Sequence, residues 1–557
     1  MVRLDRVLDT LRRRPSSVSR QHETPADAEY AMHTARYPIS TYSPFIKRHP
    51  WTDATRLEKI RLNTWFCLPE WIPLIGRVWD IPRVHAYKRF KDWSDQYGPI
   101  FSVNIFGINH VWLASDRIAN DLLSRRAMKH SDRPSINQLA DSKSEPEYLP
   151  LLGYNEHWRR QRKIVTQFMN TSSKAQFRNL PYLELPQMLS ELIESPDDYE
   201  LFMENYTGRV ISRLSFGDPL HYDDIKRYSH GLLKAISPAA YVTNIIPQLK
   251  ALPALLSPWK REERARHDEE RVFFMRMHGT VSSKMAAGTA QPSYMKEVLD
   301  NQPKSGLSDM EAAYIVGMIG LAGVLTTSST LMTYLLAMTL YPQWQTKVQE
   351  EIDRVCGDRM PNLDDSPQMP ILRSVVMELI RWRPITPSSI PHETTEDDVY
   401  DGYFIPKGTY IHPNQWAITR EASMYPDPEV FNPDRWLNPA YPTYKEPITK
   451  FPSIQNYTTF GYGRRICMGM DLVENEFFIA IGGMAWALNI TKKRDAMGRE
   501  IHVPQHEYST YLISRPKKFA FELKPRSEKR KLQVADYWSA AIPLLDPPVA
   551  NKIPSEE

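Results

Sequence analysis

The sequence is poor in cysteine, in glycine and in excess charge of either sign. Its 557 residues include 3 cysteines, too few for a disulfide framework, so we expect a reducing, intracellular compartment. The 70 Lys and Arg nearly balance the 66 Asp and Glu, and a formal net charge of +4 argues against nucleic acid as a partner. Glycine is scarce at 22 residues and proline abundant at 45, which indicates rigid turns rather than flexible linkers.

The first 60 residues lack an apolar run of the length that a secretory signal or a membrane anchor needs. We predict a polar extension over 1–60. Residues 1–20 can form an amphipathic helix, with leucines on one face and arginines around them. Three interpretations stay open: a solvated arm, a helix on a membrane surface, and a mitochondrial presequence, which Asp5 and Asp9 disfavour because such peptides are poor in acid.

One internal stretch is apolar enough to cross a membrane, because no charged residue occurs between 312 and 346. Its middle is rich in small and hydroxylic residues, among them Thr326 to Thr330. A lipid-facing helix has no need of so many hydroxyl groups, whereas a helix beside a buried cofactor has. We therefore expect a helix buried in the protein core. The alternative is a membrane-inserted binding protein that uses 312–340 as a span.

The remaining pattern predicts a mainly α-helical body with a small β component. The expected helices are 82–97, 115–126, 155–170, 182–195, 199–215, 222–236, 258–286, 306–340, 342–356, 368–382 and 468–488. Strands are expected at 100–106 and 110–114, with shorter strands between about 385 and 415. We expect the extension 1–60, one large domain over 61–525, and a charged, Pro-rich tail over 526–557.

The most informative segment is the ten-residue pattern F-x-x-G-x-R-x-C-x-G, which begins at Phe460 and is followed at once by an apolar helix. Gly463 and Gly469 carry no Cβ and let the backbone approach a flat ligand closely. Arg465 can pair with an anionic group of that ligand. Backbone N–H groups at the helix N-terminus stabilise the anionic sulfur of Cys467, and Phe460 can shield it from water. Such a thiolate is a fit axial ligand for haem iron.

The alternative for Cys467 is a buried structural cysteine, which is how we interpret Cys67 and Cys356. The five matching positions favour the ligand. With them the segment resembles the haem-ligand loop of the cytochrome P-450 family, the haem-thiolate monooxygenases. The resemblance covers about 65–525 and implies one large, mainly α domain of that family that binds haem b.

Family resemblance further implies how the enzyme works. It implies a monooxygenase that uses O2, a hydrophobic small-molecule substrate and electrons from an NADPH-dependent flavoprotein reductase. The chain looks most like filamentous-fungal members from secondary-metabolite pathways. From position on the buried helix and after Arg381, the expected pocket residues are Tyr314, Met318, Leu321, Ala322 and 385–390.

Several further motifs match the family's pattern. Glu378 and Arg381 match its E-x-x-R pair, and Arg435 lies in a matching P-x-R-W element. The resemblance implies that these three form a buried network that supports the haem loop. The spacing alone is a weak signal, because Glu263 and Arg266 share it.

Three residues are expected to bind the haem propionates by the same resemblance. Trp158 and Arg162 match a W-x-x-x-R helix and lie at i, i+4, so both face the same way. His392 occupies a position from which family members often contact a propionate. The alternatives are an exposed basic helix for the first two and a residue at the surface end of a strand for His392.

The buried helix carries Gly323 and Thr326 where the family has A/G-G-x-D/E-T-T. The resemblance implies that Gly323 leaves room for dioxygen and that Thr326 helps to deliver protons. Leu325 stands where the family has an acid, and leucine cannot relay a proton. Ordered water, a polar substrate group or impaired proton delivery are open explanations. A fourth is a haem-thiolate enzyme that catalyses oxidative coupling, dehydration or rearrangement without ordinary hydroxylation.

The expected location follows from these features together. We expect a peripheral protein on the cytosolic face of the endoplasmic reticulum, in contact with the membrane surface, and favour this over a mitochondrial location.

Overall fold

The described part of the chain is mainly helical. The computed structural model describes residue 76 and residues 78–546, except 140, 173–176, 220 and 239. The predicted extension 1–60, its amphipathic helix and Cys67 lie outside the described residues. The longer helices are α3 (Ala86–Tyr97), α6 (Glu156–Ser172), α7 (Leu180–Glu194), α8 (Tyr199–Phe216), α9 (Tyr222–Ile236), α10 (Pro258–Ala286), α11 (Tyr294–Ser305), α12 (Asp309–Leu340), α13 (Pro342–Cys356), α14 (Pro370–Trp382), α16 (Met470–Ala487) and α17 (Glu528–Leu545). The short helices are α4 (Asp116–Asn120), α5 (Ala127–His130) and α15 (Gln415–Ile418).

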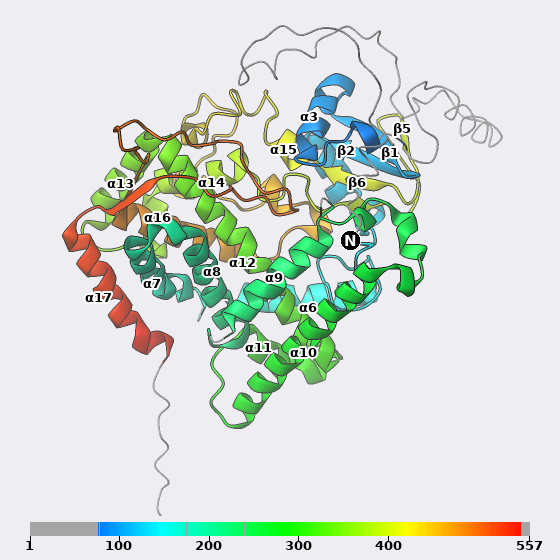
Figure 1. The fold of residues 1–557 in the computed structure, drawn as a ribbon, viewed down its shortest axis with the longest axis horizontal. Coiled ribbons are helices and arrows are strands. Elements are labelled where there is room, and N and C mark those ends of the chain that lie inside the picture. Colours follow the sequence, from blue (N-terminus) through cyan, green and yellow to red (C-terminus); the bar gives the residue numbers. More distant parts are fainter. Residues whose placement is uncertain are drawn as a thin grey trace, which may run out of the picture. The chain divides into compact units, whose positions relative to one another are not determined.

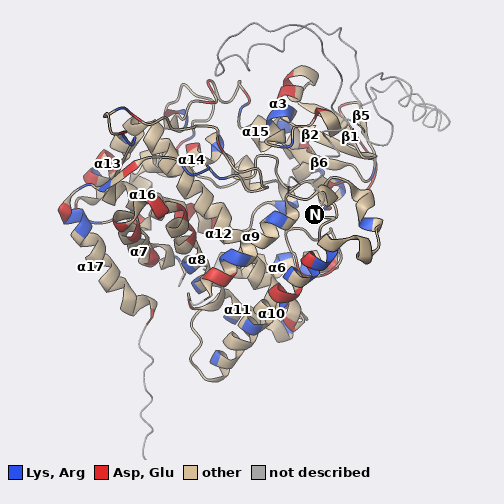
Figure 2. Ribbon diagram, viewed as in Figure 1, with Lys and Arg blue, Asp and Glu red and all other residues tan. Residues whose placement is uncertain are grey.

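The helix α12 forms the centre of the helical body (Figure 1). It begins at a capping box, in which the Ser308 hydroxyl accepts from the Glu311 N–H and the Glu311 carboxylate accepts from the Ser308 N–H. It packs against α8, α9, α10 and α16. Lys, Arg, Asp and Glu lie on the surrounding helices, whereas the body of α12 carries none (Figure 2). By length and composition α12 could span a membrane, but 78% of its apolar window is buried inside the protein. The hydroxyl-rich middle thus belongs to a core helix, as expected.

The β component consists of three small sheets. A four-stranded sheet has the order β1-β2-β6-β3, formed by β1 (Ile100–Ile105), β2 (Ile108–Leu113), β6 (Tyr410–Pro413) and β3 (His392–Glu393). The hairpin β1–β2 is antiparallel, and β2 pairs in parallel with β6, with Val111 opposite Ile411. Two further pairs are β4 (Asp398–Tyr400) with β5 (Tyr403–Ile405), and β7 (Leu488–Thr491) with β8 (Glu522–Pro525). The pairing of β2 with β6 ties the start of the described chain to the region that follows α14.

The structure differs from the prediction in three segments of the chain. The single helix expected over 115–126 is divided into α4 and the π-helical segment η2 (Asp121–Arg125), and α5 begins after the expected end. The helix α11 was not expected, because its interior carries Pro303 and its buried face is short. The expected tail 526–557 is wrong as far as 545, where α17 forms a helix capped by Ser527. Its few apolar residues are spaced so that Val534, Ala541 and Leu545 are buried, and the helix packs against α7.

Candidate active site

The Cys467 loop lies between two short 3₁₀ turns and the N-terminus of α16. The turns are η9 (Thr458–Phe460) and η10 (Gly463–Arg465). The Cys467 N–H donates to the Phe460 carbonyl at 2.8 Å, which closes the loop. Gly463 has φ +53°, and a Cβ there would lie 2.2 Å from the Leu123 carbonyl oxygen. The glycine is therefore required by the backbone of η2, whereas we had expected it to admit a flat ligand.

We infer that the sulfur of Cys467 borders a space inside the protein. The residue retains accessible surface, yet burial raises the pKa of its thiol, against the opposing effects of the Gly469 N–H and the charge of Arg162. Both facts hold together if the exposed surface faces an enclosed space rather than bulk solvent. A Cβ at Gly469 would lie 3.9 Å from the Cys467 Sγ, so a larger residue there would crowd the sulfur. An N–H donor beside a sulfur at a helix N-terminus is the setting that stabilises a thiolate.

The helix α12 borders an internal space in the same way. Ala322 is exposed, and Ile319, Gly323 and Thr326 are partly exposed, whereas the other residues of α12 from 311 to 339 are buried. Because α12 packs against α16, which follows directly after Cys467, we infer that both border one space. Met318 and Leu321 keep slight exposure at 5% each, whereas Tyr314 has none.

Thr326 and its neighbours Gly323 and Leu325 have local contacts within α12 and with α8. The Thr326 hydroxyl donates to the Ala322 carbonyl at 2.6 Å, as a helix-internal hydrogen bond. A Cβ at Gly323 would lie 3.0 Å from Ile211 of α8, so close packing of α12 and α8 also favours glycine. Leu325 is buried and offers no acid. The expected roles of Gly323 and Thr326 toward dioxygen stay predictions.

Arg465 is a buried cation that forms no ion pair with a carboxylate of the described residues, although the charge of Asp132 acts on it. Its Nε donates to the Ser131 carbonyl at 2.8 Å and its Nη2 to the Leu152 carbonyl at 2.7 Å. Its Nη1 is buried and has no hydrogen-bond partner among the described atoms. The guanidinium lies 4.4 Å from the centroid of the Trp158 ring. Burial, together with the charge of Arg133, lowers the pKa of Arg465 to about 8. A buried guanidinium with a free N–H is a site for an anionic group.

Two further arginines and one histidine surround it. Arg162 donates to the Ile466 carbonyl at 2.7 Å, next to Cys467. Burial and the charge of Arg162 lower the pKa of Arg133 to about 9. The His392 Nδ1 donates to the His130 carbonyl at 2.7 Å, and burial followed by the charge of Arg133 holds the pKa of His392 well below its ordinary value. An anion bound here would favour the protonated ring, which could then donate from Nε2.

Arg133 was missed by sequence reasoning. It donates to the carbonyls of Pro150, Ile390 and Pro391 at 3.2, 2.9 and 2.7 Å, so its guanidinium is held in place by backbone from two distant segments. No local pattern singles it out among the 70 Lys and Arg. The concentration of three guanidinium groups near a thiol at an internal space fits a haem, whose iron takes a sulfur ligand and whose two carboxylates need cations.

The Glu378 network is almost completely buried. The Glu378 carboxylate accepts from the Arg381 Nε and Nη2 at 2.8 and 2.7 Å, and both side chains have 0% exposure. The Arg435 Nε and the Trp436 Nε1, on the turn η8 (Pro433–Trp436), approach the same carboxylate at 3.4 and 3.0 Å. Arg381 also donates to backbone carbonyls such as Pro428 O at 2.9 Å. The geometry joins α14 to η8, and its support of the haem loop stays a prediction.

Tyr314, which we expect to line the pocket, contacts α10 instead. The Tyr314 hydroxyl donates to Glu270 of α10 at 3.3 Å, and the Tyr148 hydroxyl donates to the same oxygen at 2.8 Å. Tyr314 therefore points toward α10 and not into the internal space, since its hydroxyl is satisfied by a buried carboxylate. Met318, Leu321 and Ala322 remain the candidates on α12.

Comparison with known proteins gives one consistent family. The Cytochrome P450 family model matches residues 67–488. Cytochrome P450 monooxygenase 58 of Postia placenta is 33% identical over 468 residues, which cover 82% of this chain and 88% of the relative. Cytochrome P450 monooxygenase virE of Hypocrea virens is 32% identical and covers 86% and 88%. Cytochrome P450 monooxygenase fogE of Aspergillus ruber is 29% identical and covers 86% and 90%.

Among solved structures, a zebra fish cytochrome P450 with abiraterone has the same fold. It superposes with a TM-score of 0.62 at 22% sequence identity, over 79% of this chain and all of the other.

Proposed function

Since the chain belongs to the cytochrome P450 family, we propose that it inserts one oxygen atom from O2 into a hydrophobic small molecule of a secondary-metabolite pathway. The fungal sources of the matching monooxygenases support the pathway. The observation that carries the proposal is Cys467, whose accessible sulfur lies beside the Gly469 N–H and the charge of Arg162, with Arg133 and Arg465 clustered near Arg162. Haem bound there supplies oxygen activation, with electrons from an NADPH-dependent flavoprotein reductase.

The residues of this chain then have distinct tasks. The Gly469 N–H opposes the effect of burial on the pKa of the Cys467 thiol, and it would stabilise the sulfur as a thiolate when iron is bound. Arg465, Arg162 and Arg133 hold carboxylates of the cofactor, because none of the three forms an ion pair with a carboxylate of the described residues. The apolar surface of α12 around Leu321 excludes water and receives an apolar substrate.

The reduced, carbon-monoxide-bound difference spectrum tests thiolate ligation. We expect a strongly red-shifted Soret band in the wild type, no such band in Cys467→Ala, and an unchanged band in the matched variant Cys356→Ala, whose thiol is buried against Asp365. A wild-type-like band in Cys467→Ala would refute the ligand assignment.

Isotope labelling tests the reaction. A panel of apolar small molecules is incubated with holoenzyme, reductase, NADPH and ¹⁸O2, and we expect label in the product. A product without label, whether oxidised by coupling or formed by redox-neutral dehydration or rearrangement, would instead support the alternative that Leu325 motivates.

We also propose that the protein lies on the cytosolic face of the endoplasmic reticulum through a peripheral membrane contact. The segment between α9 and α10 supports this, because Leu255 and Leu256 are 85% and 64% exposed. Flotation with phospholipid vesicles tests the contact. Binding should be lost in Leu255→Asp/Leu256→Asp and kept in Leu532→Asp, an equally exposed leucine of α17 at 66%. Flotation of both variants would overturn the assignment.

A further inference from the structure

The segment 146–153 supplies carbonyl groups to two of the buried arginines. Its Pro150 carbonyl accepts from the Arg133 Nε at 3.2 Å, and its Leu152 carbonyl accepts from the Arg465 Nη2 at 2.7 Å. The segment forms no helix or strand, so a regular pattern of backbone hydrogen bonds does not fix its shape. The direction of both guanidinium groups therefore depends on what holds this segment in place.

Tyr148 is the centre of a turn within the segment. Its carbonyl accepts from the N–H groups of Leu151 and Leu152, at 2.7 and 2.9 Å. Leu152 is the residue whose own carbonyl accepts from Arg465. Tyr148 is 2% exposed and Leu152 is 0% exposed, so the packed surroundings leave the turn little room for another shape. A displacement of Tyr148 would therefore move the acceptor of Arg465.

The phenol of Tyr148 is attached to α10. Its hydroxyl donates to the Glu270 carboxylate at 2.8 Å and accepts from the Arg266 Nη2 at 2.8 Å. Glu270 is 0% exposed and also accepts from the Arg266 Nη1 at 2.7 Å. Burial and the charge of Glu270 raise the pKa of Tyr148, so the phenol stays protonated and remains a donor. A buried polar network in which these groups have partners holds them in one arrangement.

The preceding residue attaches the segment to α10 a second time. The Glu147 carboxylate pairs with the His267 Nε2 and, at 3.4 Å, with the Arg271 Nε. Residues 147 and 148 thus bind side chains of α10 between 266 and 271, and the segment follows the position of that helix.

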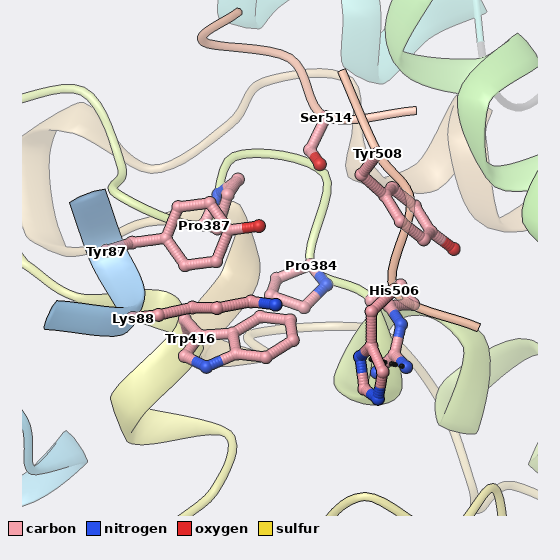
Figure 3. Close-up of a pocket in the computed structure, with 9 residues that line it drawn as sticks. Tyr87, Lys88, Pro384, Pro387, Trp416, His506, Tyr508 and Ser514 are labelled. Carbon is pink, nitrogen blue, oxygen red and sulfur yellow. Dashed lines mark hydrogen bonds between the residues drawn. The ribbon is translucent and has the colours of Figure 1, made fainter. Parts of the chain in front are cut away.

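The other acceptors of Arg133 lie in a segment that backbone hydrogen bonds hold. They are the carbonyls of residues 390–391, which continue into β3 and its pairing with β6. Earlier in that segment the Pro387 carbonyl accepts from the Trp416 N–H at 3.0 Å, and both residues line the crevice drawn in Figure 3. One side of Arg133 is thus held by backbone pairing, and the other side depends on the side chains that link 146–153 to α10.

We propose that Tyr148 is a positioning residue of the cofactor site, which directs the guanidinium groups of Arg133 and Arg465 toward the carboxylates of haem. It does so by joining the turn 148–152 to α10. The inference rests on the proposed function, because it takes these carboxylates as the partners of the two arginines. It gives α10 a part in cofactor binding, although α10 contributes no residue to the Cys467 loop or to the arginine cluster.

Haem transfer and redox titration of the holoenzyme test the proposal in Tyr148→Phe, which removes the hydroxyl and keeps the ring. We expect haem to transfer to excess apomyoglobin at least about threefold faster than from the wild type, because the arginines are less well directed. The midpoint potential of the haem should become more negative, because a haem carboxylate that loses its cation stabilises the ferric form. The Soret band of the reduced carbon-monoxide complex should stay red-shifted, since the thiolate ligand is unchanged.

Tyr314→Phe is the matched control. The Tyr314 hydroxyl donates to the same Glu270 oxygen at 3.3 Å, but Tyr314 belongs to α12 and not to the turn 148–152. Each variant removes one phenol from one buried carboxylate, so a merely structural role would lower the unfolding temperature in both. The transfer rate and the potential should change in Tyr148→Phe alone. In an Arg133→Met background, Tyr148→Phe should accelerate transfer by a smaller factor, since one of the arginines that it directs is gone.

Three results would overturn the proposal. They are a wild-type transfer rate and potential in Tyr148→Phe, an equal change of both in Tyr314→Phe, and an undiminished factor in the Arg133→Met background. Each would show that Tyr148 stabilises the fold without directing the arginines. Failure of the proposed function has a different signature, namely a wild type without the red-shifted band or a Cys467→Ala variant that keeps it.

Discussion

At the scale of single residues, Arg133 shows what a folded structure adds to a motif. The residue contacts backbone carbonyls of the segments 150 and 390–391 and lies within electrostatic reach of Arg162 and Arg465. We predict that Arg133→Met lowers haem affinity by about 2 kcal/mol, roughly 30-fold, since a charge-assisted hydrogen bond to a haem carboxylate is lost. The haem-to-protein ratio after gel filtration measures this.

Two controls separate charge from packing in this prediction. Arg133→Lys keeps the charge and loses part of the carbonyl contacts, so it should retain more haem than Arg133→Met. Lys163→Met removes an exposed charge from α6 and should leave the ratio unchanged. Equal haem loss in the Lys and Met variants would mean that Arg133 acts by holding the backbone alone.

The sequence identified the residues of the loop, but it did not identify the contacts that require them. Gly463 was expected to make room for a flat ligand, but its positive φ and the nearby Leu123 carbonyl already require glycine. Gly323 likewise packs against Ile211. A sequence motif shows which residue type occurs at a position. It does not show which neighbouring residue requires that type, because the neighbour comes from a distant part of the chain. Arg133 was not predicted for the same reason.

At the scale of helices and strands, the predictions were most accurate where a sequence pattern extended over many residues. Long helices such as α10 and α12 were predicted within a few residues of their observed ends, because their sequence patterns extend over many turns. The E-x-x-R spacing occurs also at Glu263 and Arg266, which form an ion pair as well, but those side chains keep 6% and 16% exposure. Complete burial distinguishes Glu378 and Arg381, and burial is a property of packing.

The pairing of β2 with β6 predicts a pH dependence. The His110 Nδ1 and the His412 Nε2 are 3.0 Å apart, and the His412 ring stacks on Trp112 at 4.2 Å between centroids. Burial lowers the pKa of His110 to about 4, and burial and the charge of His110 hold the pKa of His412 well below its ordinary value. Unfolded histidines titrate near 6.5, so between pH 6.5 and about 4 the unfolded chain binds protons that the folded chain does not.

The free energy of unfolding should therefore fall as the pH falls, by about 2 kcal/mol for one such ring between pH 7 and pH 5. Urea denaturation at both pH values measures the drop. It should be smaller in His412→Phe, which keeps the stack on Trp112 with a ring that does not titrate. His502→Gln, at an exposed position, should show the wild-type drop. An identical drop in His412→Phe would mean that other groups cause it.

At the scale of the whole molecule, α17 makes the C-terminal region part of the fold. Its Arg530 guanidinium lies 4.7 Å from the centroid of the Trp486 ring in α16, and its Tyr537 ring contacts the same indole edge-on. At its end Asp546 forms a two-point ion pair with Arg213 of α8, at 2.8 and 2.9 Å. The helix thereby joins α8 and α16, and α16 follows directly after the Cys467 loop.

We predict that loosening α17 weakens haem retention through this connection. Val534→Asp places an unpaired carboxylate at a position that is 2% exposed, and it should lower the free energy of unfolding by about 3 kcal/mol and reduce the temperature at which the Soret band is lost. Leu532→Asp, two residues earlier on the same helix at 66% exposure, should change neither, although its change in charge is the same. The two variants alter different faces of α17. An equal loss of stability and of the Soret band in both variants would therefore assign the effect to charge or helix propensity. Loss of stability in Val534→Asp with an unchanged Soret transition would show that α17 stabilises α7 and α8 without supporting the haem loop.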